Sequence, residues 1–206
     1  MITPEKVDLG KQHKEDYVAP KKPVLLTIAP AVYLGIAGSG APGSPAFTTR
    51  IGALYAMAYT VKMTRKFAGQ QDYTIGKLES LYWTEPNGQD FDGVAKNAWQ
   101  WQMLIRTPGF VIAAELASAA SILMGKGKPP EVKQVGLTSI AEGPCVQMLH
   151  LGPYERIGET VAKLKTFAES KGLTFHGRHH EIYLSDPRRV PPEKLKTILR
   201  EPVTKV

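Results

Sequence analysis

Strands and helices are expected in the same order twice along this chain, and this repetition limits the folds that it can adopt. Each copy contains a strand, a long helix and two further strands, judging by hydrophobic periodicity and by glycine and proline positions. The expected strands span 24–28, 31–37, 76–85, 98–106, 146–151, 173–176 and 181–184. The expected helices span 46–67, with Ser44 as the N-cap and Pro45 at the first helical position, 107–124, opened by Thr107-Pro108, and 154–171. We therefore predict an α+β fold of two βαββ-type repeats with pseudo-twofold symmetry. Its antiparallel sheet is covered by helices on one face, and a ligand cleft lies between the halves.

The domain limits follow from changes in composition along the chain. Residues 1–22 form a polar, lysine-rich segment, which we interpret as an N-terminal arm. The remaining residues, 23–206, are expected to be one ligand-binding domain with a first half at about 23–128 and a second half at about 129–206. The glycine and proline cluster at 125–130 is the best candidate linker between these halves. Because the element order repeats and each small sheet needs to be covered, we expect one compact unit with no long flexible linker there.

Composition indicates an ordinary soluble globular protein, since 43% of the residues are hydrophobic and 22% are charged. The first residues lead into a charged stretch, so no signal peptide is expected. The longest apolar region, 110–124, contains Glu115 and is too short to span a bilayer, so no membrane partner is expected. The single cysteine, Cys145, excludes an internal disulfide and fits a cytoplasmic location. It lies in an apolar run, where we expect it to be buried.

The formal net charge of +7 permits contact with nucleic acid, but the distribution of the charge argues against it. Basic residues are spread over the arm, the helix faces and the proline-rich tail, without helix-turn-helix or zinc-finger spacing. We therefore expect no nucleic-acid partner and interpret the charge as a solvated surface. The sequence carries no signal for a particular oligomeric state.

Acids and aromatic residues share faces of the expected strands. Alternate residues of a strand point to the same side, so Glu181 and Tyr183 should project together. The same rule places Glu79 and Trp83 on one face of another strand. Stacked rings and a poorly hydrated carboxylate are what a pocket for flat or cationic organic molecules needs. The candidate ligand-binding residues are Glu181, Tyr183, Trp83, Glu79, Tyr154, Trp101 and Tyr55.

Each candidate also has a purely structural interpretation. Glu181 can be a solvent-facing carboxylate paired with Arg178 or Arg188, and Glu79 a surface acid near Lys77. The aromatic candidates can be ordinary core residues, as most buried rings are. Residue pattern alone leaves both interpretations open.

No metal ion or cofactor is expected. Two of the three clustered histidines, His179 and His180, are adjacent in a strand and point to opposite faces, and no regular zinc spacing accompanies them. The glycine-rich stretch 35–43 lacks the lysine and serine of a phosphate-binding loop. We interpret these glycines as turn formers.

Four blocks in this order resemble the GyrI-like small-molecule-binding family in its stand-alone bacterial form. The blocks are Lys6-Val7-Asp8-Leu9, residues 53–62 (ALYAMAYTVK), residues 78–83 (LESLYW) and residues 177–189 (GRHHEIYLSDPRR). The resemblance implies the fold predicted above. It also matches Glu181 to the acidic strand residue of the family's cleft, and it favours Trp83 as part of that cleft.

Two functions from different classes fit these residues. The favoured one is a binding module that sequesters or senses diverse lipophilic aromatic, often cationic, compounds by stacking, apolar burial and one or two acids. The alternative, which the resemblance also implies, is a hydrolase that opens cyclopropane rings in electrophilic natural products. Glu181 would then activate water, and Tyr183 or Glu79 would assist the leaving oxygen.

Overall fold

The computed structural model describes residues 5–85, 88–89, 91 and 93–206. These residues form four α-helices and nine β-strands, and all pairings between named strands reported below are antiparallel, so the predicted α+β class is confirmed. The chain folds into two compact units, each assembled from three separate segments. Unit 1 is formed by the described part of Met1–Lys14 with Ala31–Gly76 and Ala95–Ile140, and unit 2 by Glu15–Pro30, Lys77–Val94 and Ala141–Val206.

The two units are interleaved in sequence, so their limits differ from the consecutive halves expected at 23–128 and 129–206. The cause is strand pairing over long sequence distances. Strand β1 (Val24–Ile28) lies early in the chain but pairs with β6 (Gly143–Leu151) in unit 2. Strand β5 (Gly136–Ile140) lies directly before β6 but pairs with β2 (Ala31–Ser39) in unit 1.

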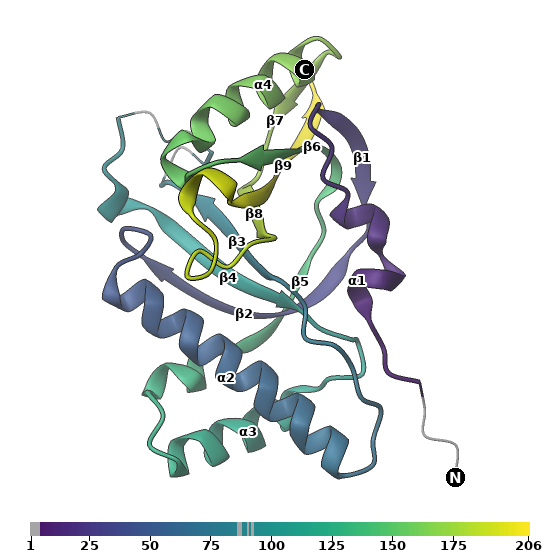
Figure 1. The fold of residues 1–206 in the computed structure, drawn as a ribbon, viewed down its shortest axis with the longest axis vertical. Helices are drawn as coiled ribbons and strands as arrows, with labels where there is room; N and C mark the ends of the chain where they lie inside the picture. Colours follow the sequence, from purple (N-terminus) through teal and green to yellow (C-terminus); the bar gives the residue numbers. More distant parts are fainter. Residues whose placement is uncertain (1–4, 86–87, 90, 92) are drawn as a thin grey trace. The chain divides into compact units, whose positions relative to one another are not determined.

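Unit 1 is built on a small sheet with the strand order β4-β2-β5. Helices α2 and α3 of this unit lie side by side (Figure 1). Tyr33, Leu34 and Ile36 of the central strand β2 are buried, as expected for a strand with neighbours on both edges. The other elements of the unit are α1 (Leu9–Gln12), α2 (Pro45–Phe67), β4 (Gln100–Arg106) and α3 (Ala113–Gly125), with short 3₁₀ turns at Lys96–Ala98 and Pro130–Gln134.

The start of α2 agrees with its sequence signal, whereas that of α3 does not. The Ser44 side chain accepts a hydrogen bond from the Phe47 backbone N–H, and Pro45 occupies the first turn of α2. Helix α3 was expected from residue 107 but begins at Ala113, where the Glu115 carboxylate accepts the Ile112 N–H at 2.9 Å. A capping carboxylate three residues into the helix fixes its start better than the upstream proline does.

The cluster at 125–130 lies inside unit 1, so it is not a linker between the two units. Helix α3 ends at this cluster, where the backbone N–H groups of Lys126 and Lys128 both donate to the Leu123 carbonyl. Gly127 takes the left-handed conformation (φ 69°) that such a helix end requires.

Trp101 is fully buried in unit 1 and packs against the backbone of Gly38. Its ring meets Phe47 edge to face at 5.0 Å, and its indole N–H donates to the Gly40 carbonyl at 3.1 Å. A Cβ atom on Gly38 would lie 2.2 Å from the Trp101 ring. Glycine is therefore required at this position for the ring to pack as it does.

We expect Gly38→Ala to destabilise the protein by about 1–3 kcal/mol, the usual cost of forcing extra volume into a packed core. Urea unfolding followed by tryptophan emission measures the change. Gly52→Ala is the matched control, because Gly52 lies in α2 with no atom within 4 Å of the added carbon. This control should be neutral or stabilising, since alanine favours a helix. Equal stability of the two variants would contradict the proposed packing.

Unit 2 contains a sheet with the strand order β1-β6-β9-β8-β3, and β7 pairs separately with the end of β9. Helix α4 packs on one face through Leu164 and Ala168, which meet Val146, Met148 and Leu199 in a buried cluster. We call this side the α4 face. The elements not yet introduced are β3 (Leu78–Trp83), α4 (Ile157–Glu169), β7 (Leu173–Phe175), β8 (His179–Tyr183) and β9 (Lys196–Lys205), with 3₁₀ turns at Lys14–Tyr17, Tyr154–Arg156 and Pro192–Lys194.

Two features of the structure depart from the sequence prediction. The first is that strands β5 and β9 were not predicted, although β9 lies between β6 and β8 in its sheet. The expected arm at 1–22 is partly ordered by contacts, since Asp16 is buried and the Pro20 carbonyl accepts the Leu149 N–H at 2.8 Å. Residues 1–4 of that arm lie outside the described part of the chain. Among the helices that the structure describes, none has the length and apolar composition needed to cross a membrane.

Candidate functional site

Glu181 lies on the α4 face of the unit 2 sheet, at the centre of β8. It pairs with Ser80 of β3 on one side and with Leu199 of β9 on the other, and paired residues share a face. Tyr183, two residues further along, projects to the same face, as predicted. The carboxylate is nearly buried, with a side-chain exposure of 10%. A carboxylate in such surroundings interacts strongly with any charge or proton donor that reaches it.

His179 connects Glu181 to a second buried acid. Its Nε2 atom lies 3.3 Å from the Glu181 carboxylate, and its Nδ1 atom forms a short contact with Glu201. Burial lowers the pKa of His179, but the charge of Glu201 and the contact with Glu181 outweigh this and raise the pKa to about 10. The ring is therefore protonated at neutral pH, and it can hold one oxygen of Glu181 in place.

Three phenols surround this carboxylate. The hydroxyls of Tyr82 and Tyr183 are hydrogen-bonded at 2.8 Å, and the Tyr154 ring meets the Tyr183 ring edge to face at 5.9 Å. Burial, and next the charge of Glu181, raise the pKa of Tyr154 to about 12, and the same two causes raise the pKa values of Tyr82 and Tyr183 well above their usual range. All three phenols are consequently neutral proton donors over the physiological range. Of the predicted site residues, Glu181, Tyr183 and Tyr154 thus form one cluster.

Glu79 lies on the opposite face of the same sheet and is not part of this cluster. It is fully buried, accepts a hydrogen bond from the Tyr17 hydroxyl at 2.9 Å, and lies 3.1 Å from His180 Nε2. The distance between the Glu79 carboxylate and His180 Nε2 is that of an ion pair, but the two groups are not aligned as a hydrogen bond. A joint role of Glu79 and Glu181 at one reacting atom is therefore unsupported by the geometry, because the sheet separates them.

A network of buried charges continues from Glu79 across this second face. His180 Nδ1 lies 2.8 Å from Glu142, whose other oxygen accepts a hydrogen bond from Arg200 at 2.7 Å. Arg200 also donates to the side-chain oxygen of Gln147 at 2.7 Å and to the Asp16 carbonyl at 2.5 Å. Burial raises the pKa of Glu142, but His180 and Arg200 together lower it to about 2. The network fixes the segment around Asp16 to the sheet.

Trp83 shares the face of Glu79, as predicted, and its ring is covered by a cation. The Arg178 guanidinium carbon lies 3.8 Å from the ring centroid, a close cation–π contact. The indole N–H donates to Glu85 at 3.0 Å. The ring therefore already stacks on a positive group of the protein itself, and contact with a ligand stays a prediction.

The last two predicted residues, Trp101 and Tyr55, belong to unit 1. Trp101 is the buried core residue described above. Tyr55 stacks on Tyr59, with ring centroids 6.4 Å apart, as their spacing of one helical turn predicts. Ligand contact by either Trp101 or Tyr55 stays a prediction.

We call Glu181, Tyr183, Tyr154, Tyr82, His179 and Glu201 together the Glu181 cluster. Sequence reasoning missed the last three of these residues. Tyr82 falls on the α4 face, opposite to its neighbour Trp83, because it pairs with His179 in the sheet. His179 was considered only as a metal ligand, and Glu201 lies in the unpredicted strand β9. The histidine was the one available signal, since a buried histidine two residues from an acid in a strand shares that acid's face. Across the chain positions that the structure covers, no group of three or more candidate ligands is arranged to hold a metal ion.

Comparison with known proteins places the chain in a family. The GyrI-like small molecule binding domain matches residues 22–203. An uncharacterized conserved protein from Listeria innocua is 37% identical, with a TM-score of 0.88 and coverage of 97% of this chain and 100% of that one. A hydrolase from Listeria innocua is 35% identical, with a TM-score of 0.85 and the same coverage.

A more distant structure shares the fold alone. The C-terminal domain of EcmrR is 12% identical, with a TM-score of 0.58 over 90% of this chain and 98% of that domain. No curated protein matches the chain. The match over residues 22–203 and the identity with the Listeria proteins show that the chain belongs to the GyrI-like small-molecule-binding family.

Proposed function

We propose that this protein is a hydrolase of small aromatic electrophiles, with Glu181 as the general base. The observation that carries the proposal is the placement of a nearly buried carboxylate, held by His179, on the same face as two hydrogen-bonded phenols. Two Listeria innocua structures described as hydrolases, at 35% and 36% identity over 97% of this chain, support this function over binding alone.

Each group of the cluster has a role in the proposed reaction. The Glu181 carboxylate accepts a proton from a water molecule as the water oxygen attacks an electrophilic carbon of the substrate. In a cyclopropane conjugated with a carbonyl group, the ring carbon–carbon bond breaks, and its electron pair passes to the carbonyl oxygen of the substrate. The phenol of Tyr183, whose pKa burial and then the Glu181 charge keep far above its usual range, donates a proton to that oxygen, and the proton held by Glu181 then returns to Tyr183. His179 and Glu201 hold the carboxylate oriented. Cyclopropane-bearing electrophiles are the substrate class that fits the family resemblance.

Binding without turnover is the second candidate, and the aromatic rings around Glu181 favour it. Tyr82, Tyr154 and Tyr183 offer ring faces and edges beside a carboxylate, which suits lipophilic aromatic cations. Such cations are expected to bind with micromolar-range affinity. They are also expected to raise the melting temperature, because a ligand of the native state stabilises it by mass action.

One assay separates the two functions. The protein is incubated with an excess of a cyclopropane-bearing aromatic electrophile in ¹⁸O-labelled water, and the product is followed by absorbance and mass spectrometry. Hydrolysis predicts many turnovers per protein and one ¹⁸O atom in the product. Stoichiometric binding with unchanged compound would overturn the hydrolase proposal for this substrate class and support sequestration.

A further inference from the structure

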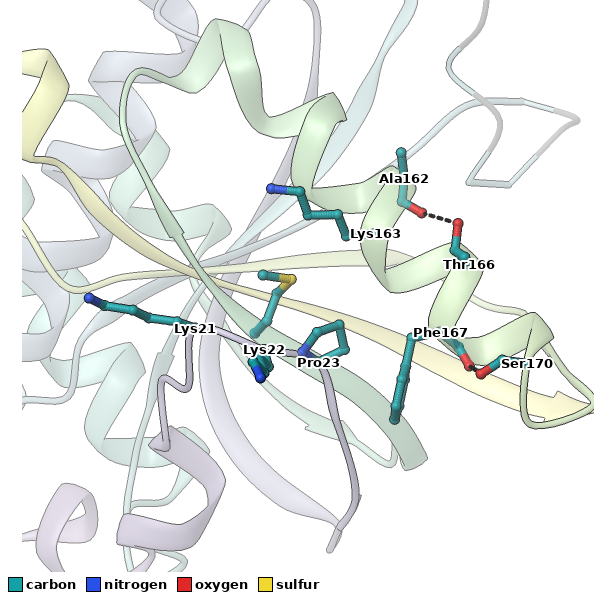
Figure 2. Close-up of a pocket in the computed structure, with 9 residues that line it drawn as sticks. Lys21, Lys22, Pro23, Ala162, Lys163, Thr166, Phe167 and Ser170 are labelled. Atoms are coloured by element: carbon teal, nitrogen blue, oxygen red, sulfur yellow. Dashed lines mark hydrogen bonds between the residues drawn. The ribbon is translucent and has the colours of Figure 1, made fainter.

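A groove in unit 2 lies between α4 and the segment that leads into β1 (Figure 2). Its volume is about 560 Å³, within the range of roughly 300–1,000 Å³ that is usual for small-molecule sites. The Leu149 N–H bonds to the Pro20 carbonyl, so the approach to β1 is tied to β6 and forms a fixed wall. The lining residues are Lys21, Lys22, Pro23, Met148, Ala162, Lys163, Thr166, Phe167 and Ser170.

The charge of this groove has one sign. Lys21, Lys22 and Lys163 are exposed, and none of them forms an ion pair among the residues that the structure describes. The lining contains no acidic side chain. A fourth lysine, Lys171, places its ammonium nitrogen 5.8 Å from the centre of the Phe167 ring. Lys163 also interacts electrostatically with Glu159, an acid outside the lining, so the excess positive charge of the groove comes mainly from Lys21 and Lys22. This excess attracts an anion to the groove.

The polar and apolar parts of the groove are separated. In Figure 2 the side chains of Lys21 and Lys163 extend toward the same end, while Phe167 and Ser170 lie at the other end. Met148 is almost buried, at 4% exposure, and Phe167 and Pro23 are half-buried, so the groove also has an apolar lining. A ligand that fits this arrangement has an anionic head for the lysines and an apolar body for the lining.

We propose that this groove binds small anionic amphiphiles, such as medium-chain or arylalkyl carboxylates. The proposal is independent of the hydrolase function, because the groove contains no member of the Glu181 cluster. It also requires the opposite ligand charge from the Glu181 cluster, whose aromatic and acidic groups suit cations. The groove is therefore expected to select anions and the Glu181 cluster to select cations.

Calorimetric titration with decanoate, below its critical micelle concentration, tests the proposal, and decyltrimethylammonium serves as the chain-matched cation. Wild type should bind decanoate, more weakly at higher salt, and should bind the cation at this groove at least about tenfold more weakly. The double variant Lys21→Glu with Lys163→Glu should weaken decanoate binding by about tenfold or more, since each change replaces attraction by repulsion.

A matched double variant, Lys165→Glu with Lys194→Glu, controls for net charge. Both lysines are exposed in unit 2 but do not line the groove, so decanoate affinity should change by less than about twofold, the scale of a remote screened charge. Equal losses in the two double variants, no binding by wild type, or displacement of decanoate by an equal concentration of the cation would each overturn the proposal. Sedimentation with anionic lipid vesicles distinguishes a membrane surface from a free amphiphile. Vesicle binding that disappears in the groove variant would also overturn the proposal as stated.

Discussion

Replacing Glu181 with glutamine is expected to reduce hydrolysis by about 100- to 10,000-fold, the usual contribution of a general base. Glutamine keeps the size of the side chain, but its amide cannot accept a proton from the attacking water. The same change removes the charge that faces bound cations. We expect cationic aromatic ligands to lose about 1–3 kcal/mol of binding free energy, while neutral aromatic ligands lose little. Turnover assays and isothermal titration on the same preparations measure both effects.

Two controls make the Glu181→Gln result specific. Glu193→Gln makes the same replacement of a carboxylate by an amide at an exposed position of unit 2, and it should leave turnover and binding unchanged. Tyr183→Phe removes the proposed proton donor while keeping the ring, so it should reduce turnover more than it reduces ligand binding. Unchanged turnover and equal ligand affinities in Glu181→Gln would show that the reacting site lies elsewhere.

Replacing His180 with glutamine is expected to destabilise the protein by about 3–5 kcal/mol, the cost of removing one partner from a buried ion pair. His180 is fully buried between Glu142 and Glu79, and its loss leaves the Glu79 carboxylate without a cation at ion-pair distance in the described network. The Glu142–Arg200 pair remains in place. Chemical denaturation followed by circular dichroism measures the change, with His176→Gln, at an exposed histidine, as the control.

The His180→Gln variant should also alter the pH dependence of stability. Burial lowers the pKa of His180, but the charge of Glu142 and the contact with Glu79 raise it from an ordinary 6.5 to about 9. A pKa that is raised on folding stabilises the native state fully below the unfolded value, and this contribution is lost as the pH rises through the folded value. Wild-type stability should therefore fall between about pH 6.5 and 9. In the variant this decrease should be smaller, with the titration of His179 remaining; an unchanged curve would contradict a protonated His180.

Local signals predicted those parts of the fold that depend on neighbouring residues. The Ser44 cap and Pro45 predicted the start of α2, and period-two alternation predicted that Glu181 and Tyr183 share a face. Burial of Cys145 followed from its apolar surroundings and is confirmed. These features depend on contacts within a few residues, which a single sequence displays directly.

The pairing of strands that are far apart in the chain could not be predicted from the sequence. Strand β9 contains Arg200, Glu201 and Pro202, residues that ordinarily indicate an exposed segment, yet all three are buried. Arg200 and Glu201 are stable there because Glu142 and His179 supply opposite charges from distant segments. For the same reason the Glu181 cluster could be predicted only in part. Glu201 and Tyr82 join it through the register of β9 and β3 with β8, which no local pattern encodes.

The position of β9 has a consequence for how the chain acquires its structure during synthesis. Among the described strands, β9 is the last to leave the ribosome, yet it lies between β6 and β8 and supplies Arg200 and Glu201. Until it emerges, His179 and Glu142 are already present on the nascent chain without Glu201 and Arg200, their partners from β9. Such charges stay hydrated and resist burial. We therefore expect the unit 2 sheet to close only after β9 has emerged, because the polar groups on both of its faces lack their β9 partners until then.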